Sequence, residues 1–154
     1  MPENAKPLPS KALATAFWLN FIWINVSEVA RYFLVVRPLL RSHFPDQPQI
    51  GAMNHQIFAI WGVWDLVLIL AAIGFYWLWL ERFGQSLRQL IAASLAFTLT
   101  VFGLLWIGVA NMGLAPFSMV LAALPLAWVE QLIACWIVAW SIRRYHPSAS
   151  IRSM

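Results

Sequence analysis

Residues 57–80 read IFAIWGVWDLVLILAAIGFYWLWL, a run of 24 residues in which Asp65 is the one charged side chain. A helix of that length rises about 1.5 Å per residue, enough to cross a hydrocarbon core about 30 Å thick. The run has no alternation of polar and apolar residues, so it does not resemble a strand of a membrane barrel. It predicts a transmembrane helix.

Three further apolar runs, residues 13–36, 90–110 and 117–142, are of similar length. The chain as a whole is 62% hydrophobic and 10% charged, with a mean hydropathy of +0.72. A soluble domain carries about 25% charged residues. We therefore predict an all-α integral membrane protein, a bundle of four transmembrane helices.

The predicted organisation is one membrane domain between two short tails. Prolines 38, 45 and 48 argue against a helix in the connection between the first two runs, because proline lacks the backbone N–H that a helix needs. The predicted segments are an N-terminal tail 1–12, a membrane domain 13–142 with helices at about 13–36, 57–80, 90–110 and 117–142 and an outer loop 37–56, and a basic tail 143–154.

Loop charge predicts that both termini are cytoplasmic, because lysine and arginine are retained on that side of a membrane. The tails and the turn between the second and third runs carry Lys6, Lys11, Arg82, Arg88, Arg143, Arg144 and Arg152. The opposite side carries Arg37 and Arg41. We expect a multi-pass protein of a plasma membrane, such as the bacterial inner membrane. The net charge of +4 then reflects topology, and we expect no nucleic-acid partner.

Common kinds of cofactor and catalytic site have no support in the sequence. Cys135 is the single cysteine, so neither a disulfide nor a cysteine metal site is expected. His43, His55 and His146 lie in the outer loop, at a helix start and in the tail, where no pair could ligate haem across the membrane. With no phosphate-binding loop or hydrolase motif, we expect no cofactor or metal, and we favour a protein that is not an enzyme.

Four charged residues interrupt the apolar runs, which is costly in lipid and therefore informative. They are Glu28, Arg31, Asp65 and Glu130. Glu28 lies eight residues before the outer end of its run, and Asp65 lies eight residues into its own, which places both about 12 Å deep. Glu130 is expected nearer the midplane. We predict that three carboxyls and one guanidinium converge in the outer half of the bundle.

Helical periodicity predicts which faces are buried. At 100° per residue, Asn20, Ser27, Glu28 and Arg31 share an arc of about 100°, which we expect to face the interior. Small residues, which let helices approach closely in lipid, mark a face on each of the last two runs. These faces are Ala93, Ala96, Thr100, Gly103 and Ile107, and Ala123, Ala127, Glu130, Ala134 and Ser141.

Each polar feature also has a purely structural interpretation. Glu28 and Arg31 are three residues apart and can pair within one helix. Asp65 can hold helices together by accepting a hydrogen bond from a tryptophan indole or from Arg31. Glu130 has no evident cationic partner in the sequence. Five tryptophans lie deep enough either to pack between helices, which we favour, or to line a site for a flat apolar ligand. They are Trp23, Trp64, Trp106, Trp128 and Trp136.

The leading hypothesis is an acidic site of Glu28, Asp65 and Glu130, balanced by Arg31, that takes part in proton- or cation-linked transport or binds a small lipophilic or cationic ligand. One arginine cannot neutralise three buried carboxylates, so protons or a bound cation must supply the rest. The alternative is a non-catalytic accessory or assembly subunit of a larger membrane complex. An enzyme acting on a lipid headgroup, with Asn111 beside the acids, is a third reading. We expect lipid and either further copies or a membrane complex as partners.

Overall fold

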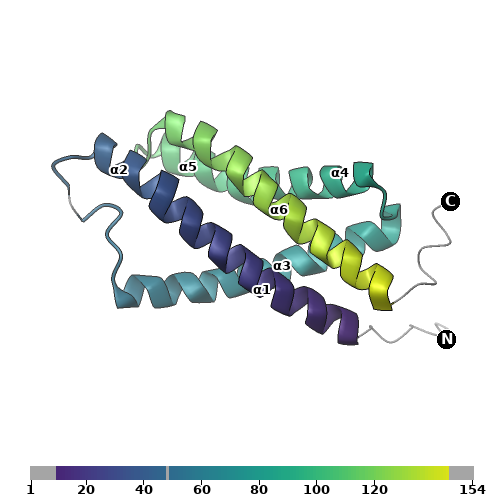
Figure 1. The fold of residues 1–154 in the computed structure, drawn as a ribbon. Coiled ribbons are helices and arrows are strands. Elements are labelled where there is room, and N and C mark those ends of the chain that lie inside the picture. The colour runs from purple at the N-terminus through teal and green to yellow at the C-terminus, as the bar shows by residue number, and fades with distance from the viewer. Residues whose placement is uncertain (1–9, 48, 146–154) are drawn as a thin grey trace, which may run out of the picture.

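Four long helices make up the fold. The computed structural model describes residues 10–47 and 49–145, which form helices joined by short connections (Figure 1). The four continuous helices, each long and apolar enough to cross a membrane, are Ser10–His43, His55–Phe83, Leu87–Asn111 and Phe117–Tyr145. The predicted tails up to residue 9 and from residue 146, with Lys6, His146 and Arg152, lie outside the described residues.

The first long helix consists of α1 (Ser10–Arg31), a π-helical segment η1 (Tyr32–Val36) and α2 (Arg37–His43). Pro38 cannot donate a hydrogen bond to the turn before it, and the helix widens there, with the N–H of Arg37 bonded to the carbonyl of Tyr32. The helix therefore continues to His43. The prediction that residues 37–43 belong to a non-helical loop is wrong, because proline is tolerated in the first turn of α2.

The second long helix is α3 (His55–Phe83), and it has a defined start and end. The Asn54 side chain caps it by accepting a bond of 2.9 Å from the N–H of Ile57. Gly84 follows its last residue with φ at 88°, a conformation that glycine adopts without the steric penalty of a Cβ. The tight turn brings the chain directly into the third helix.

The third long helix is interrupted by a second π segment, so that it comprises α4 (Leu87–Thr98), η2 (Leu99–Gly103) and α5 (Leu104–Asn111). Two hydroxyls bond to carbonyls of the preceding turn, Thr98 to Ser94 at 2.8 Å and Thr100 to Ala96 at 2.8 Å. Such bonds compete with the backbone ladder and bend helices. The last helix is α6 (Phe117–Tyr145), which continues through Pro125.

The helices run alternately up and down, so α1 begins and α6 ends at the same end of the bundle (Figure 1). The Thr15 hydroxyl lies 3.5 Å from the Tyr145 hydroxyl at that end. α6 packs on both α1 and α4, and α3 packs on α1, α4 and α6. Four antiparallel helices therefore form one bundle around α6.

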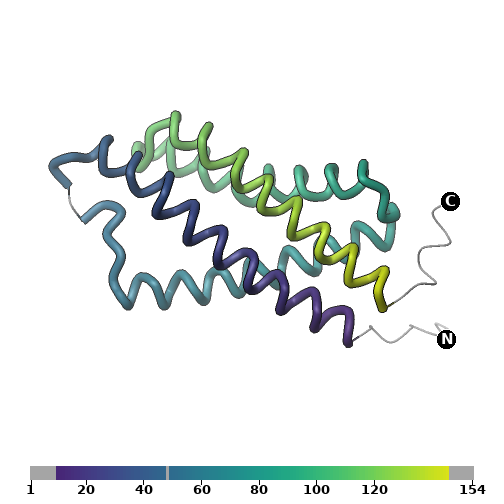
Figure 2. The backbone as a smooth tube through the Cα atoms, in the orientation of Figure 1, coloured from purple at the N-terminus to yellow at the C-terminus, as the bar shows by residue number. Residues whose placement is uncertain are grey.

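Packing is uneven along α3. Its second half buries Ile69, Ala72, Ile73 and Tyr76 in the main apolar core. Residues 55–64, by contrast, are exposed except for Trp61, which is half-buried. Figure 2 shows the backbones of α1 and α3 crossing and then diverging toward the end where α2 lies. The bundle is thus open on one side in that half.

The faces predicted from periodicity are right for two of the three helices, α1 and α6, and wrong for the third long helix. Asn20, Glu28 and Arg31 are buried and Ser27 is half-buried, and every predicted position of α6 is buried. The third helix, however, exposes Thr100 and Ile107. Its buried positions are Leu90, Ala93, Ser94, Phe97, Thr98, Phe102 and Gly103. The π segment shifts the register halfway along, so no single 3.6-residue stripe describes this helix.

Candidate functional site

The charged side chains that the described part of the chain buries are those of Glu28, Arg31, Asp65 and Glu130. They come from three helices, α1, α3 and α6, which pack on one another. Their exposed fractions are 7%, 8%, 4% and 2% respectively. All four side chains are therefore buried on helices that pack on one another, and ion pairs join three of them, Glu28, Arg31 and Glu130.

Arg31 joins two of the acids. Its Nη2 pairs with Oε1 of Glu28 on the same helix, and its Nη1 donates to Oε2 of Glu130 on α6 at 3.3 Å. The guanidinium also lies 5.3 Å from the centre of the Phe102 ring. The sequence reading found no cationic partner for Glu130, and that interpretation is wrong. Depth counting missed the pair because it ignores the length of an arginine side chain.

Glu130 is the most heavily bonded of the acids. Besides Arg31, its carboxylate accepts from the Ser27 hydroxyl at 2.6 Å and from Nε2 of Gln131 at 3.1 Å. The Tyr76 hydroxyl in turn donates to Oε1 of Gln131 at 2.9 Å. A chain of hydrogen bonds thus runs from Arg31 through Glu130 to a tyrosine deep in the core. Charge-assisted bonds of this kind fix a buried carboxylate in place.

Asp65 has a different environment. Its Oδ1 atom is buried and has no hydrogen-bond partner among the described residues. Asp65 lies on α3, which packs on the α1 helix that carries Glu28 and Arg31. The Oδ1 atom of Asp65 therefore accepts no hydrogen bond from a tryptophan indole or from Arg31. A buried polar atom without a partner is unusual and calls for a functional or solvent explanation.

Asn111 is not brought into this cluster. It is the last residue of α5 and is exposed, directly before the turn that leads to α6. It does not line the cavity that adjoins the charged residues. The headgroup-enzyme hypothesis needs Asn111 beside the acids, so it loses the geometry on which it depends.

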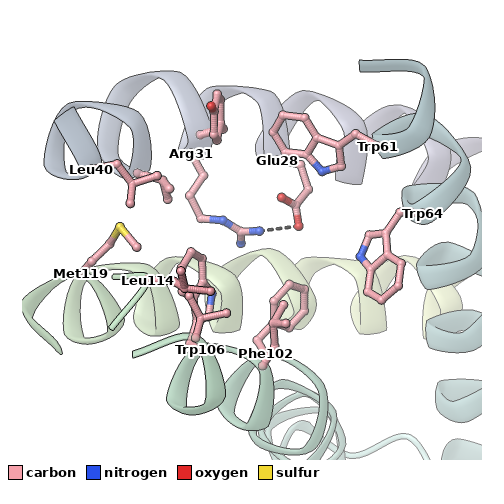
Figure 3. A pocket seen from close by; sticks show the side chains of 13 residues that line it. Glu28, Arg31, Leu40, Trp61, Trp64, Phe102, Trp106, Leu114 and Met119 are labelled. Carbon is pink, nitrogen blue, oxygen red and sulfur yellow. Dashed lines mark ion pairs between the residues drawn. The ribbon is translucent and has the colours of Figure 1, made fainter. Parts of the chain in front are cut away.

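A cavity of about 330 Å³ lies beside Glu28 and Arg31. Figure 3 shows both side chains pointing from the first long helix toward the cavity, with Phe102 and Trp106 across from them and Trp61 and Trp64 projecting from α3. Small-molecule pockets range from about 300 to 1,000 Å³. The lining residues are Glu28, Arg31, Tyr32, Val36, Leu40, Trp61, Trp64, Phe102, Leu105, Trp106, Val109, Leu114 and Met119.

The cavity opens sideways. Trp64, which is 58% exposed, and the exposed side chains of Leu105 and Leu114 lie on its wall. The exposed residues of α3 near Trp64 are apolar, among them Ile60, Val63 and Val67. The Tyr32 ring bridges part of the gap, since its centre is 4.9 Å from that of Trp61.

Both π-helical segments border the cavity. Tyr32 and Val36 belong to η1, and Phe102 belongs to η2. π turns inside α-helices are rare and occur frequently at functional sites, where the extra residue redirects side chains. Here they turn one aromatic ring from each of two helices toward the same space.

Four of the five tryptophans expected to lie deep take one or other of the two roles that the sequence left open. Trp64 and Trp106 line the cavity. Trp23 and Trp128 bridge helices, because their indole N–H groups donate to the Glu130 carbonyl at 3.0 Å and to the Ser94 hydroxyl at 3.2 Å. Trp136 is 52% exposed. Trp61, which the sequence did not single out, also lines the cavity; its position four residues before Asp65 was the available signal.

Comparisons with protein-family models, with curated proteins and with solved structures found no match. Within residues 10–47 and 49–145, no three His, Cys, Asp or Glu side chains come together as a set that could hold a metal ion. The site therefore consists of an aromatic cavity with the Glu28–Arg31 ion pair on its wall. Two further carboxyls, those of Asp65 and Glu130, are buried in the bundle but do not line the cavity.

Proposed function

We propose that the chain is a multi-pass membrane protein with cytoplasmic termini whose buried acids bind a small lipophilic or cationic ligand in a proton- or cation-linked step. The membrane assignment rests on the four long apolar helices. The orientation is supported by charge: five described basic residues lie toward the end where α1 begins and α6 ends. They are Lys11, Arg82, Arg88, Arg143 and Arg144.

One observation carries the proposed activity: Glu28 lies on the wall of the cavity, and it is one of three carboxyls that the described residues bury with a single arginine. If all three acids were ionised, the interior would hold two uncompensated negative charges. Unpaired charge is expensive in a low dielectric, so protons or a bound cation must balance the cluster. A ligand that brings positive charge into the cavity competes with those protons.

Proteoliposomes that contain a pH-sensitive dye test this function. We expect a gradient of potassium or of benzyltrimethylammonium to drive proton movement through the wild-type protein. Glu28→Gln should reduce the rate to that of empty liposomes, because it removes the carboxylate that reaches the cavity. Glu81→Gln, an exposed glutamate near the end of α3, is the matched control and should retain the rate. Equal rates in wild type and Glu28→Gln would refute the proposal.

A second proposal, that the chain is a non-catalytic subunit of an oligomer or a larger membrane complex, is favoured by the outer half of α3. Residues 55–64 are mostly exposed, so a helix of another chain has room to pack there. Cross-linking through a cysteine placed at Val63, which is 65% exposed, tests this. A cross-linked product in native membranes supports a subunit role, and its absence together with proton-linked flux supports the first proposal.

A further inference from the structure

We infer that the cavity binds a lipophilic organic cation, with the positive group facing Glu28 and aromatic rings around it, and that the ligand enters sideways from the outer half of the bilayer. This inference rests on the proposed function and specifies its ligand. It draws on three features: the charge at the cavity wall, the aromatic lining and the position of the opening.

Charge complementarity favours a cation over an anion. Arg31 is the one basic group on the cavity wall, and both of its terminal nitrogens are already engaged, with Glu28 and with Glu130. The buried acids outnumber it, since Asp65 and Glu130 are buried in the described part of the bundle as well as Glu28. An anionic headgroup would add charge of the sign already in excess, whereas a cation reduces the excess.

The lining favours an organic cation over a hydrated metal ion. Tyr32, Trp61, Trp64, Phe102 and Trp106 surround the space, and the rest of its wall is aliphatic apart from Glu28, Arg31 and the Met119 thioether. Aromatic faces attract quaternary ammonium groups, with tryptophan the strongest, but they offer few oxygen ligands to a metal ion. One carboxylate within a ring of aromatic side chains matches a positive group that carries apolar substituents.

The position of the opening indicates the route by which the ligand enters, and the route in turn indicates that the ligand is lipophilic. Trp64 lies nine residues after the start of α3, so it is about 13 Å along that helix. The exposed residues that flank it are apolar: Ile60, Val63 and Val67 are each about 60% exposed or more. In a bilayer this side faces acyl chains, so a ligand that reaches the cavity from here partitions into lipid first.

A binding measurement on purified, detergent-solubilised protein tests the inference. The probe is radiolabelled benzyltrimethylammonium, with two unlabelled competitors: neopentylbenzene, which replaces the charged nitrogen by carbon, and benzenesulfonate, an anion. We expect saturable binding that neither competitor displaces at the concentration at which the unlabelled cation does. Binding that benzenesulfonate displaces equally well, or no saturable binding, would overturn the inference.

Variants separate the charge from the aromatic contribution. Glu28→Gln should weaken binding by about tenfold or more. Trp64→Leu should weaken it about two- to fivefold, since a cation–π contact at a partly exposed ring contributes roughly 0.5–1 kcal/mol. Trp18→Leu is the control, because Trp18 is 61% exposed and does not line the cavity. If Glu28→Gln does not fold, Trp64→Leu decides alone. Unchanged binding in Trp64→Leu would refute the aromatic site.

The inference and the proposed function can fail separately. Proton movement in liposomes that requires Glu28, without binding of benzyltrimethylammonium, would overturn the organic-cation site and leave the acidic site standing. Saturable binding that depends on Glu28 and Trp64, without any linked proton movement, would support the ligand assignment and overturn the linkage.

Discussion

At the scale of single residues, Arg31 is the side chain that compensates the charge of the buried carboxylates. It is shared by Glu28 and Glu130, and its ring contact with Phe102 fixes it further. Removing it leaves two buried carboxylates without a cation. By contrast, removing the charge of Glu130 leaves the Arg31 to Glu28 pair intact. The two substitutions therefore differ in what they leave unpaired.

We expect Arg31→Ala to destabilise the protein by about 3–5 kcal/mol, the loss typical of breaking a buried ion pair. Glu130→Gln should cost less, about 1–3 kcal/mol, because the amide keeps the shape but weakens the bonds from Ser27 and Arg31. Thermal melts in detergent measure both, with Glu81→Gln as an unaffected control. A neutral Arg31→Ala would mean that the arginine turns away from the acids.

Sequence alone locates these residues but not all of their partners. The intrahelical spacing of Glu28 and Arg31 predicts their pair, and depth predicts that Asp65 lies near them. The bond from Arg31 to Glu130 depends on the rotation of α6 and the reach of the arginine side chain. Neither is encoded in a distance along the chain, so the sequence does not predict the pairing of Arg31 with Glu130.

At the scale of elements, apolar runs predict the four helices but place their ends too far inward. Each helix except the last begins earlier, and all four end later, than the hydrophobic run within it. Helices continue into the polar boundary because their backbone bonds are satisfied internally. The apolar runs do not predict the π segments either. These segments lie where Pro38 and the threonine hydroxyls of α4 and η2 disturb the backbone hydrogen bonds, and hydrophobicity does not register such bonds.

The small-residue face of α6 gives the prediction at this scale. Ala127 is fully buried on α6, the helix that packs on α1 and α4. Ala127→Leu should therefore push α6 away from its neighbours and lower the free energy of unfolding by about 1–3 kcal/mol. Ala71→Leu places the same side chain at an exposed position of α3 and should be nearly neutral. Melting temperatures of the two variants compare the positions. Equal losses would show that Ala127 does not face a helix.

At the scale of the whole molecule, orientation decides which side of the membrane the cavity adjoins. Reporter fusions at both termini should read cytoplasmic, and a tag inserted near Gln49 should read external, because five of the seven described basic residues of the loops and helix ends lie at the end where α1 begins. A cytoplasmic Gln49 tag would invert the bundle and place the cavity in the inner leaflet.

In the proposed function, protons balance the excess of buried carboxyls over Arg31, and a bound cation displaces them. Proton release is the direct measurement: benzyltrimethylammonium is added to purified protein in weakly buffered detergent solution containing a pH indicator. The groups that face Glu28 are Arg31 and Tyr32 from the first long helix, Asp65 from α3 and Glu130 from α6.

We predict that the wild-type protein releases protons along the same saturation curve as it binds the cation, and that Glu28→Gln releases none. Cation binding without proton release, or the same release from Glu28→Gln, would contradict the account.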